Sequence, residues 1–224
     1  MTMRKFFPHD MGGEEAGPVF PDAQDAPVFK EDWHARALAI TVLSGAHGKW
    51  NLDESRHIRE TLPTEDYTSF SYYEKWLSGL AGLLVRHGLV SKDELKDGSA
   101  DTQPLKEKTL LAKDVRAVMD KGGPSGRPIE TPRKFNLGDQ VQTKSPEETA
   151  RVENGHTRLP RYASEKNGIV VAYHGAHVLP DSNAHGLGEN PEHLYAVKFK
   201  ASDIWQDAND QDHVVVDCWE SYLR

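Results

Sequence analysis

The stretch GGPSGRPIETP, residues 122–132, decides how this chain is organised. Its three glycines and three prolines within eleven residues disfavour both helix and strand, so we predict a linker. Before it, apolar residues recur at helical spacing. After it, short β-branched and aromatic runs are separated by turn residues. The sequence therefore predicts an α+β protein, with an all-helical N-terminal half and a small β domain after the linker.

The helical domain is expected to span residues 31–121. Its first helix has apolar residues at helical spacing: Trp33, Ala37, Ile40 and Leu43. Asp53 is the expected N-cap of a short second helix, and Ser71 that of a longer third one. Further short helices are expected after Ser91 and over Thr109–Met119.

The β domain is expected to span residues 133–224 and to form a small SH3-like barrel. Its strands are predicted in four short runs: Phe135–Val141, Gly168–Val171, Leu194–Phe199 and His213–Trp219. At the other end, residues 1–30 are rich in Gly, Pro and Asp, with isolated apolar residues such as Val28 and Phe29. We expect an extended arm there, which lies across another surface.

Composition indicates a protein that completes its core against a partner, because 37% hydrophobic residues is low for 224 residues. The net charge of -8 argues against nucleic acid, whose phosphates require clustered Lys and Arg. The sequence contains no signal-peptide core and no apolar run of membrane length. Its one cysteine excludes an internal disulfide and a Cys-rich metal site in this chain alone, which fits a cytoplasmic protein.

Several candidate residues also have ordinary explanations. Histidines lie at four positions in a segment rich in Gly, Pro and Asn, and we predict a solvated loop there, with no metal site: His174, His177, His185 and His193. Cys218 is expected to be a small half-buried residue. Arg56 is expected on a helix surface, paired with Glu60 one turn on. Arg158 has the same surface interpretation.

Tyr72 and Trp76 stand four residues apart, so we expect them on one helical face. Tyr73, one step round, would face the core with the leucines of the same helix. Aromatic side chains with a polar atom on a second helical face are typical of an interface or a pocket. Ordinary core packing would give the same spacing.

Seven segments, in order along the chain, together resemble the β subunit of nitrile hydratase. They are His9-Asp-Met-Gly-Gly13, Asn51-Leu-Asp-Glu-Ser-Arg-His57, Ser71-Tyr-Tyr-Glu-Lys-Trp76, Gly155-His-Thr-Arg-Leu-Pro-Arg-Tyr162, Pro180-Asp-Ser-Asn-Ala-His-Gly-Leu-Gly188, Glu192-His-Leu-Tyr-Ala-Val-Lys-Phe199 and Asp217-Cys-Trp-Glu-Ser-Tyr-Leu223. The resemblance runs from residue 9 to the C-terminus, and the ordered set is specific although each segment is short.

The resemblance implies a partner and a reaction. The family's α subunit carries Cys-x-x-Cys-Ser-Cys, binds cobalt or iron, and has two of these cysteines oxidised, to sulfenic and sulfinic acid. The β subunit wraps that chain with its arm and helices, giving an αβ heterodimer that can double to α2β2. The expected activity is hydration of nitriles to amides, with no metal ligand from this chain. Trp76 and the sequence of residues 174–199 favour the cobalt type over the iron type.

The resemblance also assigns site residues. Arg56 and Arg158 are expected to donate to the oxidised sulfurs, because a guanidinium offers planar donors and a permanent charge. Tyr72 is expected to form a hydrogen bond at the active site. The substrate pocket is expected to be lined by three residues: Leu52, Ser55 and Trp76.

Two features depart from the family pattern. Ser55 stands where many relatives carry a bulky apolar residue, and extra residues precede His9. The second feature also resembles thiocyanate hydrolase, in which two separate chains correspond to the two halves of this one. An accessory or activator protein for a nitrile hydratase would be expected to lack the β domain with Arg158. A non-catalytic scaffold would not need both arginines and the aromatic pair.

Overall fold

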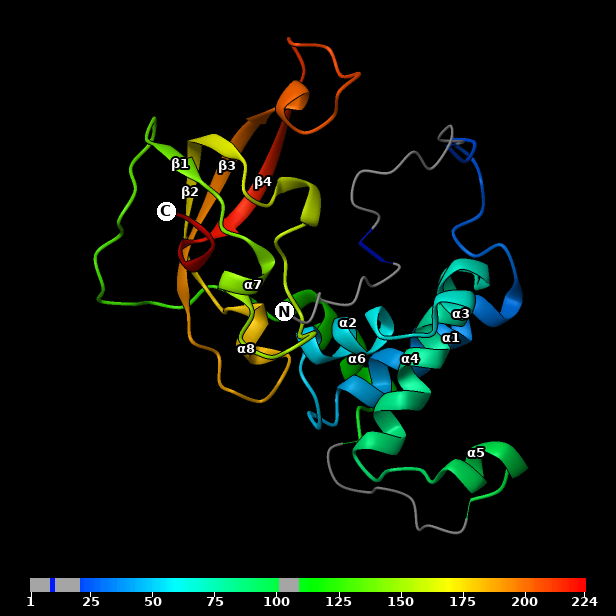
Figure 1. The fold of residues 1–224 in the computed structure, drawn as a ribbon. Coiled ribbons are helices and arrows are strands. Elements are labelled where there is room, and N and C mark those ends of the chain that lie inside the picture. The colour runs from blue at the N-terminus through cyan, green and yellow to red at the C-terminus, as the bar shows by residue number, and fades with distance from the viewer. Residues whose placement is uncertain (1–8, 11–20, 101–108) are drawn as a thin grey trace. The chain divides into compact units, whose positions relative to one another are not determined.

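A computed structural model describes residues 9–10, 21–100 and 109–224. Within these ranges the chain divides into two compact units, a helical one up to residue 123 and a β-rich one from residue 124 (Figure 1). His9 belongs to the helical unit and Asp10 to the β-rich unit. Val19, Phe20 and most of the expected arm lie outside the described residues.

The described part of the N-terminal half is helical, as predicted. Its helices are α1 (Asp32–Gly45), α2 (Leu52–Glu60), α3 (Thr64–Ser69), α4 (Tyr72–Arg86), α5 (Lys92–Asp97) and α6 (Ala112–Lys121). Helix α4 packs against both α1 and α2. Leu80 and Leu83 of α4 are buried there, together with Ala37 of α1. No helix in the described ranges is long and apolar enough to cross a bilayer.

Capping residues explain where the central helices begin. Ser71 precedes α4 and forms a capping box with Glu74, so the expected cap is confirmed. The expected cap of α2 was wrong. Asn51 takes that role, since its side chain accepts a hydrogen bond of 2.9 Å from the backbone N–H of Glu54. Asp53 lies inside the first turn, where its carboxylate accepts from an arginine one turn on.

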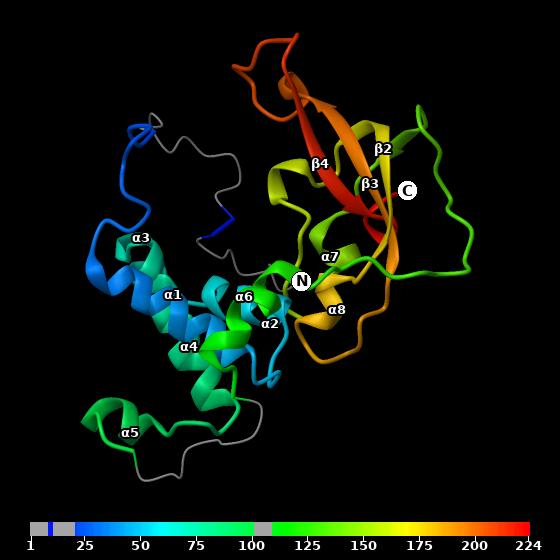
Figure 2. The same ribbon diagram turned by 180° about the vertical axis from the view of Figure 1, so that it is seen from behind.

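The β-rich unit is a curled antiparallel sheet with strand order β1-β2-β3-β4 (Figure 2). The strands are β1 (Gln140–Gln142), β2 (Asn167–His177), β3 (Glu192–Lys200) and β4 (His213–Trp219). Short helices α7 (Pro146–Thr149) and α8 (Pro180–Asn183) and three 3-10 turns, η1 (Arg161–Ala163), η2 (Ala201–Asp203) and η3 (Glu220–Tyr222), complete it. Strand β1 is shorter than predicted, because Gly138 has a φ of 90° and forms a turn before it.

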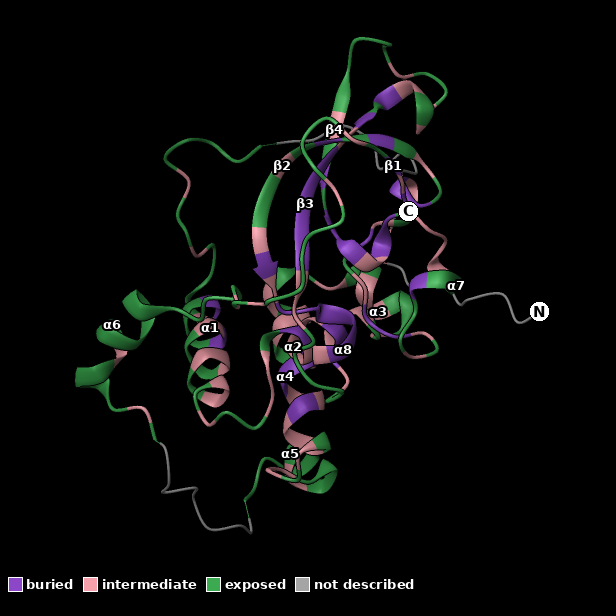
Figure 3. Ribbon diagram, turned by 90° about the vertical axis from the view of Figure 1, so that its left-hand side faces the viewer, coloured by how far each residue is buried: buried purple, intermediate pink, exposed green. Residues whose placement is uncertain are grey.

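Strand β3 is buried along most of its length and forms the centre of the β core (Figure 3). A Cβ at Gly168 on β2 would lie 2.6 Å from Val197 Cγ1 and 2.9 Å from Phe199 Cε1, so a larger residue there would collide with both side chains. Cys218 on β4 is fully buried, so its half-buried prediction was wrong. Burial raises the pKa of its thiol to about 12, with a smaller contribution from Asp217.

The predicted solvated loop over the histidines was wrong for three of them. Strand β2 continues through His174 and His177, because a bulge at Gly175, which has a φ of 86°, lets the strand bend without ending. His193 lies buried on β3, with its ring within 2.8 Å of the Tyr173 hydroxyl. Only His185 of this group lies in a turn.

Candidate functional site

In the helical unit, Tyr72 and Trp76 share one face of α4. Their ring centroids are 5.6 Å apart, and Tyr72 is 63% exposed. Tyr73 turns towards α1, where its ring lies 4.7 Å from that of His34. This is the arrangement expected from the spacing: Tyr73 faces α1, whereas Tyr72 is exposed and Trp76 is half-buried on a second face of α4.

Arg59 belongs to the same cluster, although its sequence context did not single it out. Its guanidinium lies over the Trp76 ring, 4.9 Å from the centroid, and its Nε donates to the Ser55 carbonyl at 2.8 Å. Burial lowers its pKa. The stem passes directly over Gly79, where a side chain would collide with it. In the sequence, the glycine at position 79 among the leucines of α4 is the signal that could have indicated a close contact such as that with Arg59.

Helix α2 presents three of the predicted residues. Leu52 opens the helix and is 60% exposed, whereas Ser55 is half-buried. Arg56 donates from Nη1 to the Asp53 carboxylate at 2.9 Å, so the expected pairing with Glu60 was wrong. A guanidinium has five N–H donors, and this contact leaves most of them for another acceptor.

In the β-rich unit, Arg158 has an exposed side chain on a fixed backbone. Its neighbours His156 and Leu159 are buried. Its own backbone N–H donates to the Tyr222 hydroxyl at 3.2 Å. Within the residues that the structure describes, its guanidinium makes no hydrogen bond or ion pair. A positively charged group without a partner, held by an anchored backbone, is suited to an anion from outside the chain.

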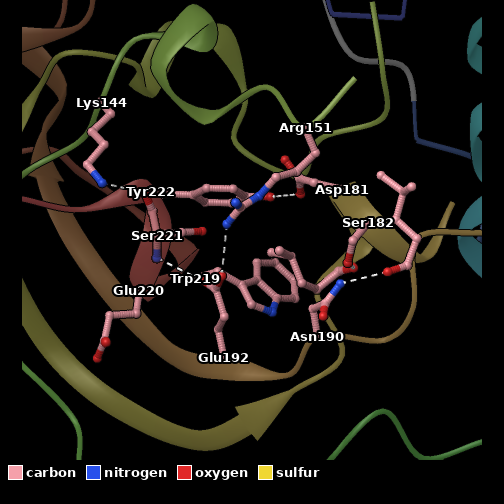
Figure 4. Close-up of polar contacts among 12 residues, drawn as sticks. Lys144, Arg151, Asp181, Ser182, Asn190, Glu192, Trp219, Glu220, Ser221 and Tyr222 are labelled. Carbon is pink, nitrogen blue, oxygen red and sulfur yellow. Dashed lines mark hydrogen bonds and ion pairs between the residues drawn. The ribbon is translucent and has the colours of Figure 1, made fainter. Parts of the chain in front are cut away.

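Tyr222 and Asp181 form a buried pair beneath this segment, and neither was predicted from the sequence. The Tyr222 hydroxyl donates to the Asp181 carboxylate (Figure 4). Burial raises the pKa of Tyr222 well above its ordinary value, and the Asp181 charge raises it further. Burial also raises the pKa of Asp181, although the hydrogen bond from Tyr222 opposes this.

His185 adds a second contact from the turn after α8. Its Nε2 accepts a 2.9 Å hydrogen bond from the backbone N–H of His156. Gly155 permits this approach, because a Cβ there would lie 2.9 Å from the same nitrogen. Three of the segments singled out in the sequence, around residues 158, 181 and 222, therefore meet at one place. Arg56 and the aromatic pair belong to the helical unit, and Arg158 to the β-rich unit.

Comparison with known proteins agrees with these segments. Residues 5–120 match the family model described as nitrile hydratase beta subunit, N-terminal, and residues 124–224 match the corresponding C-terminal model. The low-molecular weight cobalt-containing nitrile hydratase subunit beta of Rhodococcus rhodochrous is 35% identical, over 96% of this chain and 97% of that protein. The cobalt-containing nitrile hydratase subunit beta of Pseudonocardia thermophila is 34% identical, over 96% and 94%.

A third relative, the nitrile hydratase subunit beta of Pseudomonas putida, is 34% identical over 96% of this chain and 97% of that protein. Among solved structures, apo thiocyanate hydrolase from Thiobacillus thioparus aligns with a TM-score of 0.38 and 23% identity. That alignment covers 55% of this chain and 98% of the other.

Proposed function

Because this chain belongs to the nitrile hydratase β-subunit family, we propose that it contributes Arg56 and Arg158 to an active site whose metal is held by an α subunit. The chain is the β subunit of a nitrile hydratase, an enzyme that adds water to nitriles to give amides. The observation that carries the proposal is the Arg158 guanidinium, exposed and unpaired among the described residues, on a segment whose backbone is anchored.

The donor chemistry of this chain supports a metal on the partner. Thiolates are the ligands expected at the metal, and the one cysteine of this chain, Cys218, is fully buried with a raised pKa. Cobalt is the proposed metal, with iron as the alternative, because two of the relatives are named as cobalt-containing. When bound, the metal would supply Lewis-acid activation of the nitrile or of water.

The residues of this chain would supply hydrogen-bond donors and an apolar wall around that metal. Arg56 and Arg158 would donate to oxidised cysteine sulfurs of the α subunit, whose charge needs fixed cationic donors. The Tyr72 hydroxyl would donate a hydrogen bond within the site. Trp76, whose ring is fixed by Arg59, would form an apolar wall for the nitrile, with Leu52 and Ser55 beside it.

Three further properties complete the proposal. The curled sheet is interpreted as an SH3-like barrel, and the complex as an αβ heterodimer that can double. A cytoplasmic location is proposed from the single cysteine. The matches along the whole chain favour nitrile hydratase over a thiocyanate hydrolase, an accessory protein or a scaffold.

Separating the two subunits tests the proposal. The chain expressed alone is expected to bind no stoichiometric cobalt or iron and to hydrate no nitrile. The complex co-expressed with its α subunit is expected to hold about one metal per αβ pair and to produce amide. Elemental analysis and amide assays measure both. One tightly held metal in the isolated chain would contradict the model.

Replacing Ser55 by phenylalanine is expected to narrow the pocket and shift preference towards small aliphatic nitriles. Because the site is half-buried, overpacking would cost about 1–3 kcal/mol, so thermal stability is measured in parallel. The matched control is Ser55→Ala, which removes the hydroxyl without adding bulk. An unchanged ratio of kcat/KM for aliphatic and aromatic nitriles in a well-folded Ser55→Phe complex would exclude Ser55 from the pocket.

A further inference from the structure

Two backbone N–H groups, two residues apart, hold the chain around Arg158 in place. The N–H of His156 donates to His185 and the N–H of Arg158 donates to Tyr222. His185 and the acceptor of the Tyr222 proton, Asp181, both come from the short stretch that includes α8. Two anchors two residues apart fix the path of the intervening chain, and so the direction in which the Arg158 side chain leaves it.

The Asp181 contact sets the direction of the Tyr222 hydroxyl. Because its proton points at the Asp181 carboxylate, its oxygen is turned towards donors. Two donors lie there, the Arg158 backbone N–H at 3.2 Å and the Thr157 Oγ1 at 3.4 Å. Thr157 Oγ1 in turn accepts from the backbone N–H of Leu159 at 3.3 Å. The arrangement is therefore a short chain of hydrogen bonds that ends on the segment carrying Arg158.

A second buried tyrosine–carboxylate pair in the same core is built differently. Tyr195 donates to Glu220 at 2.8 Å, and Glu220 also accepts from the Lys134 backbone N–H and faces the Lys134 ammonium at 3.4 Å. Asp181 is 1% exposed, and its hydrogen-bond partners Tyr222 and Thr157 belong to the chain of hydrogen bonds that ends on the Arg158 segment. The Tyr222–Asp181 pair is therefore tied to the segment that carries Arg158, whereas the Tyr195–Glu220 pair is tied to Lys134.

We propose that Tyr222 and Asp181 are positioning residues for Arg158, acting on the reaction by fixing the backbone from which its guanidinium reaches the partner's oxidised sulfurs. The inference rests on the proposed role of Arg158. Both residues are buried in the β core, so they are expected to act through Arg158 and not on the substrate directly. Misplacement of a group by about an ångström is enough to slow a reaction about a hundredfold, so loss of one anchor has a measurable effect.

The experiment uses the co-purified αβ complex and three variants. Tyr222→Phe removes the hydroxyl and keeps the ring. Asp181→Asn keeps the shape and removes the charge. Tyr195→Phe is the matched control, because Tyr195 is equally buried and also donates to a carboxylate, but its partner Glu220 is held by Lys134 and not by residues 155–160. Each is measured alone and combined with Arg158→Lys, by kcat and KM, and hydrogen exchange is followed over residues 155–160.

Tyr222→Phe and Asp181→Asn are expected to speed exchange over residues 155–160 and to lower kcat about tenfold, with KM and subunit association nearly unchanged. In the Arg158→Lys background the further loss should be under about twofold, because the group being positioned is already gone. Tyr195→Phe should change neither segment exchange nor kcat. The fall in thermal stability of Tyr195→Phe shows how much stability the loss of one buried tyrosine–carboxylate hydrogen bond costs, for comparison with the other two variants.

Three outcomes would overturn the inference. They are unchanged exchange in Tyr222→Phe, an equal kcat loss with and without Arg158→Lys, and the same kcat loss in Tyr195→Phe. Wild-type kcat in Arg158→Lys alone has a different meaning. It would remove Arg158 from the chemistry, and the proposed function would fail at that residue whatever the exchange data show.

Discussion

Arg56→Lys and Arg158→Lys are each expected to reduce nitrile hydration about ten- to a hundredfold while the subunits still associate. Lysine keeps the positive charge and loses the planar pair of donors. Losing one charge-assisted hydrogen bond costs about 1.5–3 kcal/mol, which corresponds to that range of rates if the bond acts fully at the transition state. Steady-state kinetics on the co-purified complex measure the effect.

The control for this pair is Arg116→Lys on α6, a highly exposed arginine paired with Asp120 one turn on. Such a surface change is expected to stay within about 0.5 kcal/mol. Mass spectrometry of the partner's cysteines adds an independent readout, because loss of a donor should alter their oxidation. Near-wild-type activity in both lysine variants would show that Arg56 and Arg158 take no part in the reaction and that these arginines have at most a structural role.

Phe199→Ala is expected to lower the free energy of unfolding by about 3–5 kcal/mol, the largest stability effect proposed for this chain. The ring is fully buried at the centre of the β core and packs against Gly168. Its removal would leave a cavity, because the surrounding strands are expected to relax only partially. Since the free energy of unfolding of a domain is only about 5–15 kcal/mol, this loss would be a large part of it.

Denaturant unfolding of the complex, followed by tryptophan fluorescence, measures this loss. Val215→Ala on β4 is the matched control, because Val215 is 53% exposed in the same sheet. A change within about 0.5 kcal/mol is expected there. Equal destabilisation by the two variants would show that Phe199 is not central to the core.

Local chemistry explains which parts of the fold were predictable from the sequence. Ser71 and its Glu74 partner lie in one capping box, so the start of α4 is encoded within four residues. The β-branched and aromatic runs of β3 and β4 are similarly local. In contrast, the extent of β2 past Tyr173 depends on pairing with β3, through Ala176 with His193 and His177 with Glu192, and the composition of a segment cannot show that.

The candidate site divides along the same line. Tyr72 and Trp76 share a face because of helical spacing, which a sequence displays directly. Asp181 and Tyr222 stand 41 positions apart in the sequence, and only the tertiary fold brings them together. Arg59 was missed for a related reason, since its partner Trp76 stands on another helix. The roles of Arg56 and Arg158 came from resemblance alone.

Because Cys218 is buried, we expect this subunit not to react with thiol reagents while it is folded. A thiolate is the species that reacts with alkylating agents and oxidants, and a pKa raised to about 12 keeps this sulfur protonated at neutral pH. No side-chain surface of Cys218 is open to solvent in the folded β core. In thiol labelling, redox titration or oxidant treatment of the native complex, the signal is therefore expected to come from the cysteines of the partner, with no contribution from Cys218.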